Sequence, residues 1–118
     1  MTKLVTFLSF VTALFVNTTP LMANDDLAVD LCSNISGFAG DIMEIRQKGA
    51  PMAKVIEVSK PHIKAMKGIM PKFDNLAMDI IMSAYDYPLM GLEENKKTAT
   101  TEFSNKHMLN CLRMMNEN

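Results

Sequence analysis

The sequence lacks the short motifs that mark the common catalytic centres. It contains no glycine-rich phosphate-binding loop, no serine in a nucleophile-elbow motif and no Cys-x-x-Cys pair. Its two histidines have no partner that the sequence places beside them, whereas hydrolytic catalysis needs a nucleophile, a positioned base and an oxyanion site. We therefore predict that the chain is not an enzyme and uses no cofactor.

The sequence also has no excess of charge of either sign. It carries 12 Lys and Arg residues against 13 Asp and Glu residues, for a formal net charge of −1. A near-neutral chain has no general electrostatic attraction for nucleic acids, whose binding depends on cations placed against the phosphates. We therefore expect no nucleic-acid partner.

Only one long apolar run occurs, and it lies near the N-terminus. Lys3 precedes an apolar stretch over residues 4–16, which is followed by a polar, turn-prone segment and by Ala23. This order is typical of a secretory signal peptide, and the run is shorter than the roughly 20 apolar residues that span a bilayer. We predict that residues 1–23 are a signal peptide and that residues 24–118 form a single helical domain. The alternative is an anchor that stays uncleaved.

The chain has two cysteines, Cys32 and Cys111, and both follow the predicted signal peptide. Because an exported protein meets an oxidising compartment, an even number of cysteines predicts a disulfide. Two cysteines allow one pairing, and closing a loop of about 80 residues contributes roughly 4–5 kcal/mol in the chain-entropy model. The alternative is two free thiols. Cleavage of the signal leaves no stable membrane anchor, so we expect a periplasmic or secreted protein.

Apolar residues recur at three- and four-residue steps along the rest of the chain, which predicts helices. We find no strand alternation, no hairpin turn pair and no internal repeat in the sequence. The expected helices cover about residues 26–48, 51–60, 61–70, 75–87 and 98–115. The predicted fold class is all-α: a small bundle of four or five helices in which one disulfide ties the first helix to the last.

Local signals set the expected helix ends. Gly49 follows the first helix as a stop, and Pro51 suits the first turn of the second. Pro61 either ends or kinks that second helix. Asp74 or Asn75 is expected to cap the next helix with its side chain.

The chain is rich in methionine, with 12 Met residues. His62, Met66 and Met70 fall at i, i+4 and i+8, so they would share one face of a helix. Thioethers suit Cu(I), so a periplasmic copper-binding or metal-buffering protein using these three side chains is an alternative interpretation. Methionine is also a common flexible filler of hydrophobic cores, and our main expectation is a chain without a metal site.

Other titratable residues have ordinary interpretations. His107 shares a predicted helix face with Cys111, and we expect it to be a partly buried packing residue rather than a zinc ligand. Asp79 and Asp86 lie on a narrow polar stripe that we expect to be solvated. A deep pocket with converging polar groups around Asp79 or His107 would instead favour an enzyme.

Three further polar residues, Arg46, Gln47 and Tyr85, are candidates for contact with a partner. The alternative for Arg46 is neutralisation of the carbonyl end of the first helix. With export, small size and no catalytic set, the leading hypothesis is a non-catalytic binding or interaction module. Its partner would be a protein or a small molecule that the sequence does not name.

Several short motifs occur together along the chain. They are Cys32, Met43-x-x-Arg46-Gln47-x-Gly49, Ala84-Tyr85-x-x-Pro88, Phe103 and Cys111. This pattern resembles a loose group of small exported proteobacterial proteins of unknown function. The resemblance implies periplasmic residence, a helical fold and a bridge between the two cysteines, and it supplies no activity.

Overall fold

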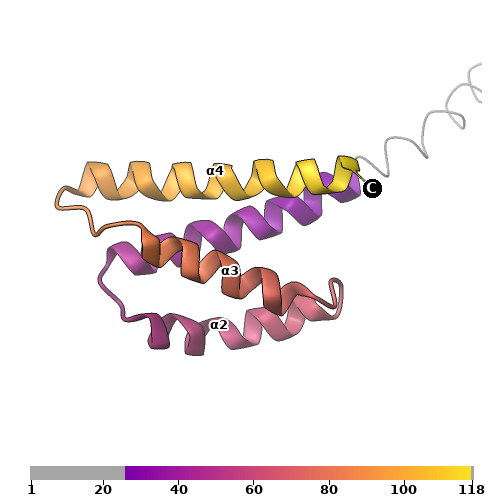
Figure 1. Ribbon diagram of the computed structural model, residues 1–118, viewed down its shortest axis with the longest axis horizontal. Helices are drawn as coiled ribbons and strands as arrows, with labels where there is room; N and C mark the ends of the chain where they lie inside the picture. Colours follow the sequence, from indigo (N-terminus) through magenta and orange to yellow (C-terminus); the bar gives the residue numbers. More distant parts are fainter. Residues whose placement is uncertain (1–25, 118) are drawn as a thin grey trace, which may run out of the picture. The chain divides into compact units, whose positions relative to one another are not determined.

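The computed structural model describes residues 26–117, in which four helices and no strands are present. A first helix covers residues 26–47, and α2, α3 and α4 cover Met52–Lys67, Phe73–Asp86 and Glu93–Glu117 (Figure 1). The predicted all-α bundle is therefore confirmed, with the lower of the two expected numbers of helices over this range.

The predicted signal peptide, residues 1–23, lies outside the described residues. Within residues 26–117, none of the helices has the length and apolar character needed to cross a membrane. The predicted export therefore stays a prediction.

Gly49 ends the first helix, as its position in the sequence indicated. Its φ of 92° lies in the left-handed region, where glycine alone is free of steric cost. The Gly49 amide donates to Arg46 O at 2.9 Å, and the Ala50 amide donates to Ile45 O at 3.3 Å. These two hydrogen bonds form a Schellman cap, which satisfies the last carbonyls of the helix and turns the chain toward α2.

Pro61 lies inside α2, so the prediction of a separate helix over residues 61–70 is wrong. Proline removes the amide that would bond to Glu57 O, but both residues are exposed, and water can bind that carbonyl. Val55 and Met66, on either side of the proline, are buried in the core. Packing of both halves of the helix therefore outweighs the local cost of Pro61.

The starts of α3 and α4 also differ from expectation. α3 begins at Phe73 without a side-chain cap, so neither Asp74 nor Asn75 caps it. Asp74 instead lies in the first turn, where a carboxylate is stabilised by the positive end of the helix dipole. α4 begins at Glu93 rather than near residue 98, and Glu93 and Glu94 supply the same stabilisation to its first turn.

The disulfide predicted between Cys32 and Cys111 is present, with Cα atoms 5.5 Å apart. It joins the first helix to α4, and the two helices lie side by side (Figure 1). Further along the same contact, Ser36 Oγ donates to Ser104 O at 2.9 Å and Ser104 Oγ donates to Ser36 O at 3.0 Å. Gly40 faces the same serine: a Cβ atom added at Gly40 would lie 3.5 Å from the side chain of Ser104. The small residues therefore allow these helices to pack closely.

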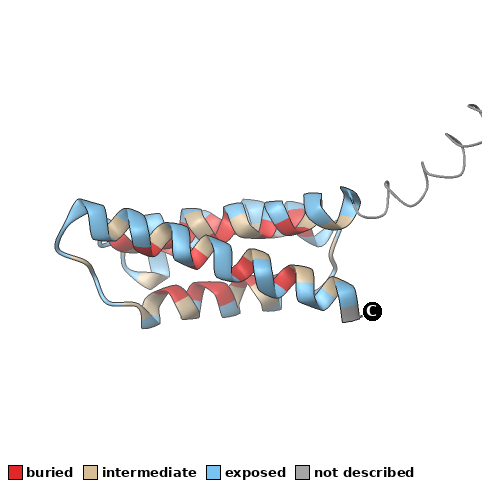
Figure 2. Cartoon of the chain, turned by 90° about the horizontal axis from the view of Figure 1, so that it is seen from above, coloured by how far each residue is buried: buried red, intermediate tan, exposed pale blue. Residues whose placement is uncertain are grey.

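The core lies where the helices face one another. Buried residues line the inward faces, and the outward faces are exposed (Figure 2). The two largest side chains with no exposed surface, Phe73 and Phe103, come from α3 and α4. The other buried apolar residues are Cys32, Ile35, Phe38, Ala39, Ile42, Met43, Val55, Met66, Ala77, Ile80, Ile81, Ala84, Ala99 and Cys111.

Candidate functional site

Arg46 and Tyr85, two of the three predicted partner-contact residues, lie against each other. The Arg46 guanidinium is over the Tyr85 ring, 4.6 Å from the ring centroid, in a cation–π arrangement. Arg46 Nη2 also donates to Tyr87 O at 3.1 Å, and the Tyr85 hydroxyl donates to Ala50 O. Burial raises the pKa of Tyr85 while the Arg46 cation opposes the rise, so the phenol is neutral and keeps the proton that it donates.

Gln47, the third of these residues, is 3 % exposed and bonds to the segment between α3 and α4. Its Nε2 donates to Pro88 O at 3.0 Å, and its Oε1 accepts from the Met90 amide at 2.9 Å. Arg46 and Gln47 together are termed the loop clamp, because their side chains hold the backbone of residues 87–90. The motif at the end of the first helix is therefore hydrogen-bonded to the chain at and just after the Ala84-Tyr85-x-x-Pro88 motif, which ends α3.

The loop clamp uses the polar groups of Arg46 and Gln47 inside the bundle. Arg46 does not bond to the carbonyls at the end of its own helix, which the Schellman cap already satisfies, but to the carbonyl of Tyr87. This arrangement gives both residues a structural role in positioning the α3–α4 connection. Contact of Arg46, Gln47 or Tyr85 with a partner stays a prediction.

His62, Met66 and Met70 do not form one helical face. α2 ends at Lys67, so Met70 lies beyond the helix, in the turn before α3. Met66 is buried in the core at 6 % exposure, whereas His62 is exposed and stacks on Phe38 with ring centroids 5.1 Å apart. Within residues 26–117, no three or more His, Cys, Asp and Glu side chains are grouped so that they could hold a metal ion. The expected ligand set is therefore split between different surroundings.

A cavity of about 480 Å³, termed the α3–α4 cavity, lies between α3 and α4. One wall consists of Leu76, Asp79, Ile80 and Ser83 of α3. Their spacing of three and four residues puts them on a single helix face. Ile35 of the first helix lines the same cavity. The predicted polar stripe of α3 thus forms part of the rim of a cavity.

The rest of the lining comes from α4 and from the turn before α3. It consists of Met70, Lys106, His107, Asn110, Cys111, Met114 and Met115. Lys106 and Asn110 are site residues that were not expected from the sequence. The available signal was their place at the border of the apolar stripe of α4, beside His107 and Cys111.

The α3–α4 cavity has two chemically different ends. The short loop between α3 and α4 makes the two helices antiparallel neighbours, so Ser83 and Lys106 lie at one end, and Leu76 and Met114 lie at the other. Along α4, the seven residues from His107 to Met114 correspond to roughly 10 Å. One end therefore carries an imidazole and polar groups, and the other carries thioethers.

His107 is a buried member of the polar end, at 9 % exposure, as the packing interpretation expected. Its ring meets the edge of Phe103 with centroids 4.5 Å apart, and its Nε2 is buried with no hydrogen-bond partner among the described residues. Burial lowers the pKa of His107, and the neighbouring Lys106 cation lowers it further. The imidazole is therefore neutral at pH 7 and presents an aromatic surface to the cavity.

The lowered pKa of His107 predicts a loss of stability in mild acid. The unfolded chain binds a proton at the ordinary histidine pKa of about 6.5, whereas the folded chain resists it. The free energy of unfolding should therefore fall as the pH drops through about 6.5 toward the lower folded-state pKa. Urea unfolding between pH 7.5 and pH 5 measures this slope. His107→Leu, with Lys106 and Asp79 retained, should lack that part of the slope; parallel curves for the two proteins would contradict the assignment.

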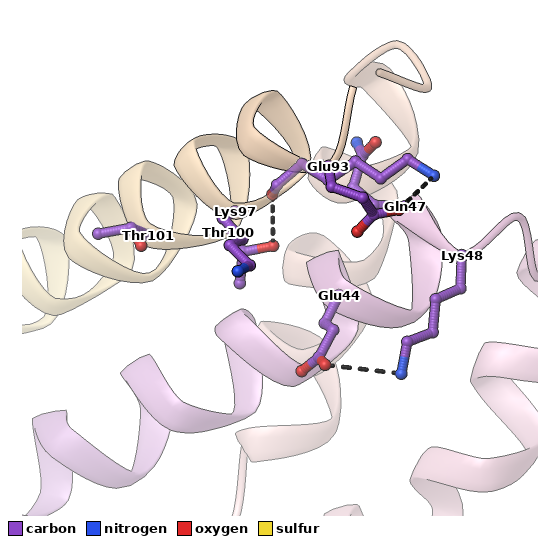
Figure 3. A pocket seen from close by; sticks show the side chains of 8 residues that line it. Glu44, Gln47, Lys48, Glu93, Lys97, Thr100 and Thr101 are labelled. Atoms are coloured by element: carbon purple, nitrogen blue, oxygen red, sulfur yellow. Dashed lines mark hydrogen bonds and ion pairs between the residues drawn. The ribbon is translucent and has the colours of Figure 1, made fainter. Parts of the chain in front are cut away.

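A second hollow, of about 490 Å³, lies between the first helix and α4 (Figure 3). Its lining is mostly charged, and its carboxylates are paired on their own helices, Glu44 with Lys48 at 3.5 Å and Glu93 with Lys96 at 3.6 Å. Ion pairs that water can reach in this way contribute little energy. The α3–α4 cavity, with its buried imidazole and apolar floor, is the better candidate for a ligand.

Comparison of the chain with protein-family models, with curated proteins and with solved structures finds no match in any of the three. A function for the chain therefore has to be inferred from the residues of the fold itself.

Proposed function

We propose that the chain is a non-catalytic binding module, exported to the periplasm or secreted, that holds a small ligand in the α3–α4 cavity. The observation that carries this proposal is the composition of the cavity. Ile35 and Ile80 are buried and form an apolar floor, whereas Asp79, Lys106 and Asn110 are exposed and form a polar rim. Its volume of about 480 Å³ falls within the roughly 300–1,000 Å³ that is usual for ligand pockets.

The lining favours a ligand with an apolar body and a polar end. The apolar part of the ligand would bind against the floor, and its removal from water supplies affinity. Lys106 and Asp79 offer one charge of each sign at the rim, where a polar group can stay partly hydrated. The neutral ring of His107 adds apolar contact area without a charge.

The proposed location is supported by the covalent link between the first and last helices. A structural disulfide persists in oxidising compartments and is rare in the reducing cytosol. Cys111 lines the α3–α4 cavity and belongs to this link. Oxidation in the exported chain would therefore fix one wall of the proposed site.

Titration with N-phenyl-1-naphthylamine, an uncharged apolar dye that fluoresces when it leaves water, tests the proposal. The wild-type chain should bind the dye saturably, with one site per chain. Asn110→Trp places a large ring at the rim of the cavity and should weaken binding by about tenfold or more. The matched control is Asn105→Trp, an exposed position on the same helix that does not line the cavity.

The two variants make the outcome specific. Equal dye affinity in wild type and Asn105→Trp, with loss only in Asn110→Trp, would support the α3–α4 cavity as the site. Absence of saturable binding to wild type, or an equal loss in both variants, would refute it. Circular dichroism and resistance of the disulfide to alkylation confirm that each variant is folded.

A further inference from the structure

Three methionines line the thioether end of the α3–α4 cavity. Met70 comes from the turn before α3, and Met114 and Met115 come from the last turns of α4. Met70 and Met115 are half-buried, and Met114 is 56 % exposed. Methionines that are far apart in the sequence thus line one cavity.

We propose that this end of the cavity binds Cu(I), with the sulfur atoms of Met70, Met114 and Met115 as its ligands. The inference rests on the proposed function, because it adds a second ligand, a metal ion, at the thioether end of the same cavity. This ligand set differs from His62, Met66 and Met70, which do not share one helix face because α2 ends at Lys67, before Met70.

The chemistry of the wall favours a soft ion. Thioether sulfur is a neutral, polarisable donor that prefers Cu(I) to hard cations such as Mg²⁺ or Ca²⁺. The sulfur of Cys111, which lines the same cavity, belongs to the disulfide and is not available as a thiolate. The methionines are therefore the sulfur donors that this cavity offers a metal.

Side-chain flexibility would let the three methionines approach one ion. Consecutive residues on a helix point about 100° apart, yet Met114 and Met115 both line the cavity. Methionine has three rotatable side-chain bonds, so its sulfur can adjust to a ligand without movement of the backbone. Met114, the most exposed of the three, gives an ion access from solvent.

The binding of Cu(I) is measured by anaerobic competition with bathocuproine disulfonate. No thiol reductant is added, so the disulfide stays oxidised. The wild-type chain should bind one Cu(I). The triple variant Met70→Leu, Met114→Leu and Met115→Leu keeps side-chain volume and should bind Cu(I) at least about tenfold more weakly. The matched control, Met52→Leu with Met82→Leu and Met108→Leu, changes three methionines outside the cavity lining and should bind as wild type.

A second measurement identifies the ligands directly. Ag(I) has the same closed-shell configuration as Cu(I) and is not redox-active. With ¹³C-labelled methionine methyl groups, Ag(I) should shift the signals of Met70, Met114 and Met115, which the three single leucine variants assign. Wild-type affinity in the cavity triple variant, or shifts of other methionines instead, would overturn the inference.

The dye titration separates this inference from the function on which it rests. Circular dichroism and resistance of the disulfide to alkylation show that the cavity triple variant is folded, so a loss of its Cu(I) affinity does not come from unfolding. A wild-type chain that binds the dye but not Cu(I) would overturn the copper site and leave the binding module standing. A chain that binds neither would overturn both.

Discussion

Loss of the Cys32–Cys111 disulfide is expected to lower the free energy of unfolding by about 4–5 kcal/mol. The two cysteines are 79 residues apart in sequence, so the bridge closes a loop that covers most of the helical bundle. In the chain-entropy model, closing a loop of this length raises the free energy of the unfolded state by about that much. A domain of this size has a total stability of about 5–10 kcal/mol, so the reduced chain should be close to unfolding at 37 °C.

Urea unfolding of oxidised and reduced wild-type protein measures the contribution of the bridge without any substitution. The control is the double variant Cys32→Ala with Cys111→Ala, whose unfolding midpoint should be low and should not respond to reductant. Cys32 has no exposed surface, so the alanine variant also loses buried contacts and should lie somewhat below the reduced wild type. A reduced wild type with the midpoint of the oxidised protein would rule out the bridge as a major source of stability.

The same reduction has a consequence for the proposed site. Cys111 lines the α3–α4 cavity, and the bridge ties that part of α4 to the first helix. A reduced chain that frays at this end should therefore lose affinity for N-phenyl-1-naphthylamine before it unfolds globally. The disulfide thus links the compartment in which the chain is expected to reside to the integrity of its cavity.

Local signals in the sequence predicted the helices better than their ends. The apolar spacing of Ile35, Phe38 and Ile42 identified the first helix, and Gly49 marked its stop because only a left-handed residue completes that cap. Pro61 does not end α2, since a proline signal is local whereas the packing of Val55 and Met66 is tertiary.

The α3–α4 cavity could not be predicted in the same way. Its walls are formed mainly by one face of α3 and one face of α4. The packing of the two helices decides which faces meet, and no local sequence pattern encodes that packing. Spacing along a single helix grouped Met70 with His62, but the fold groups it with Met114 and Met115. A ligand set formed from separate elements requires the tertiary structure.

The loop clamp lies between these two cases, because its residues could be predicted from the sequence but its contacts could not. In the sequence, Arg46, Gln47 and Tyr85 are candidates for contact with a partner, and Pro88 belongs to one of the short motifs. In the fold, their hydrogen bonds join two motifs that are about forty residues apart, as in the pair Gln47–Pro88, which is separated by 41 positions. The residues stand out in the sequence, but only the fold shows that they contact one another.

Gln47→Leu is expected to destabilise the bundle by about 2–4 kcal/mol. The amide of Gln47 is buried, and it pairs with Pro88 O at 3.0 Å and with the Met90 amide at 2.9 Å. Leucine fills the same space but leaves both backbone groups without these partners, and each unsatisfied buried group costs about 1–3 kcal/mol. Urea unfolding monitored by circular dichroism gives the size of the loss.

Gln47→Glu separates the lost donor from the lost acceptor. A carboxylate still accepts from the Met90 amide, but it faces Pro88 O without a proton to donate. Burial beside a carbonyl should raise the pKa of the introduced carboxyl in the folded chain above its unfolded value. The folded state then binds more protons, so this variant should gain stability relative to wild type as the pH falls from 7 to 5.

The two variants also decide between the structural and the partner-contact interpretations of Gln47. A surface contact would tolerate Gln47→Leu with an unchanged unfolding midpoint, and Gln47→Glu would show no pH-dependent recovery. If Gln47 is a clamp residue, both variants should have a lower free energy of unfolding. Only Gln47→Glu should recover part of that loss in acid, because only its carboxyl can regain a proton. Recovery confined to Gln47→Glu would therefore identify the hydrogen bond to Pro88 O as the contact that fixes the α3–α4 connection.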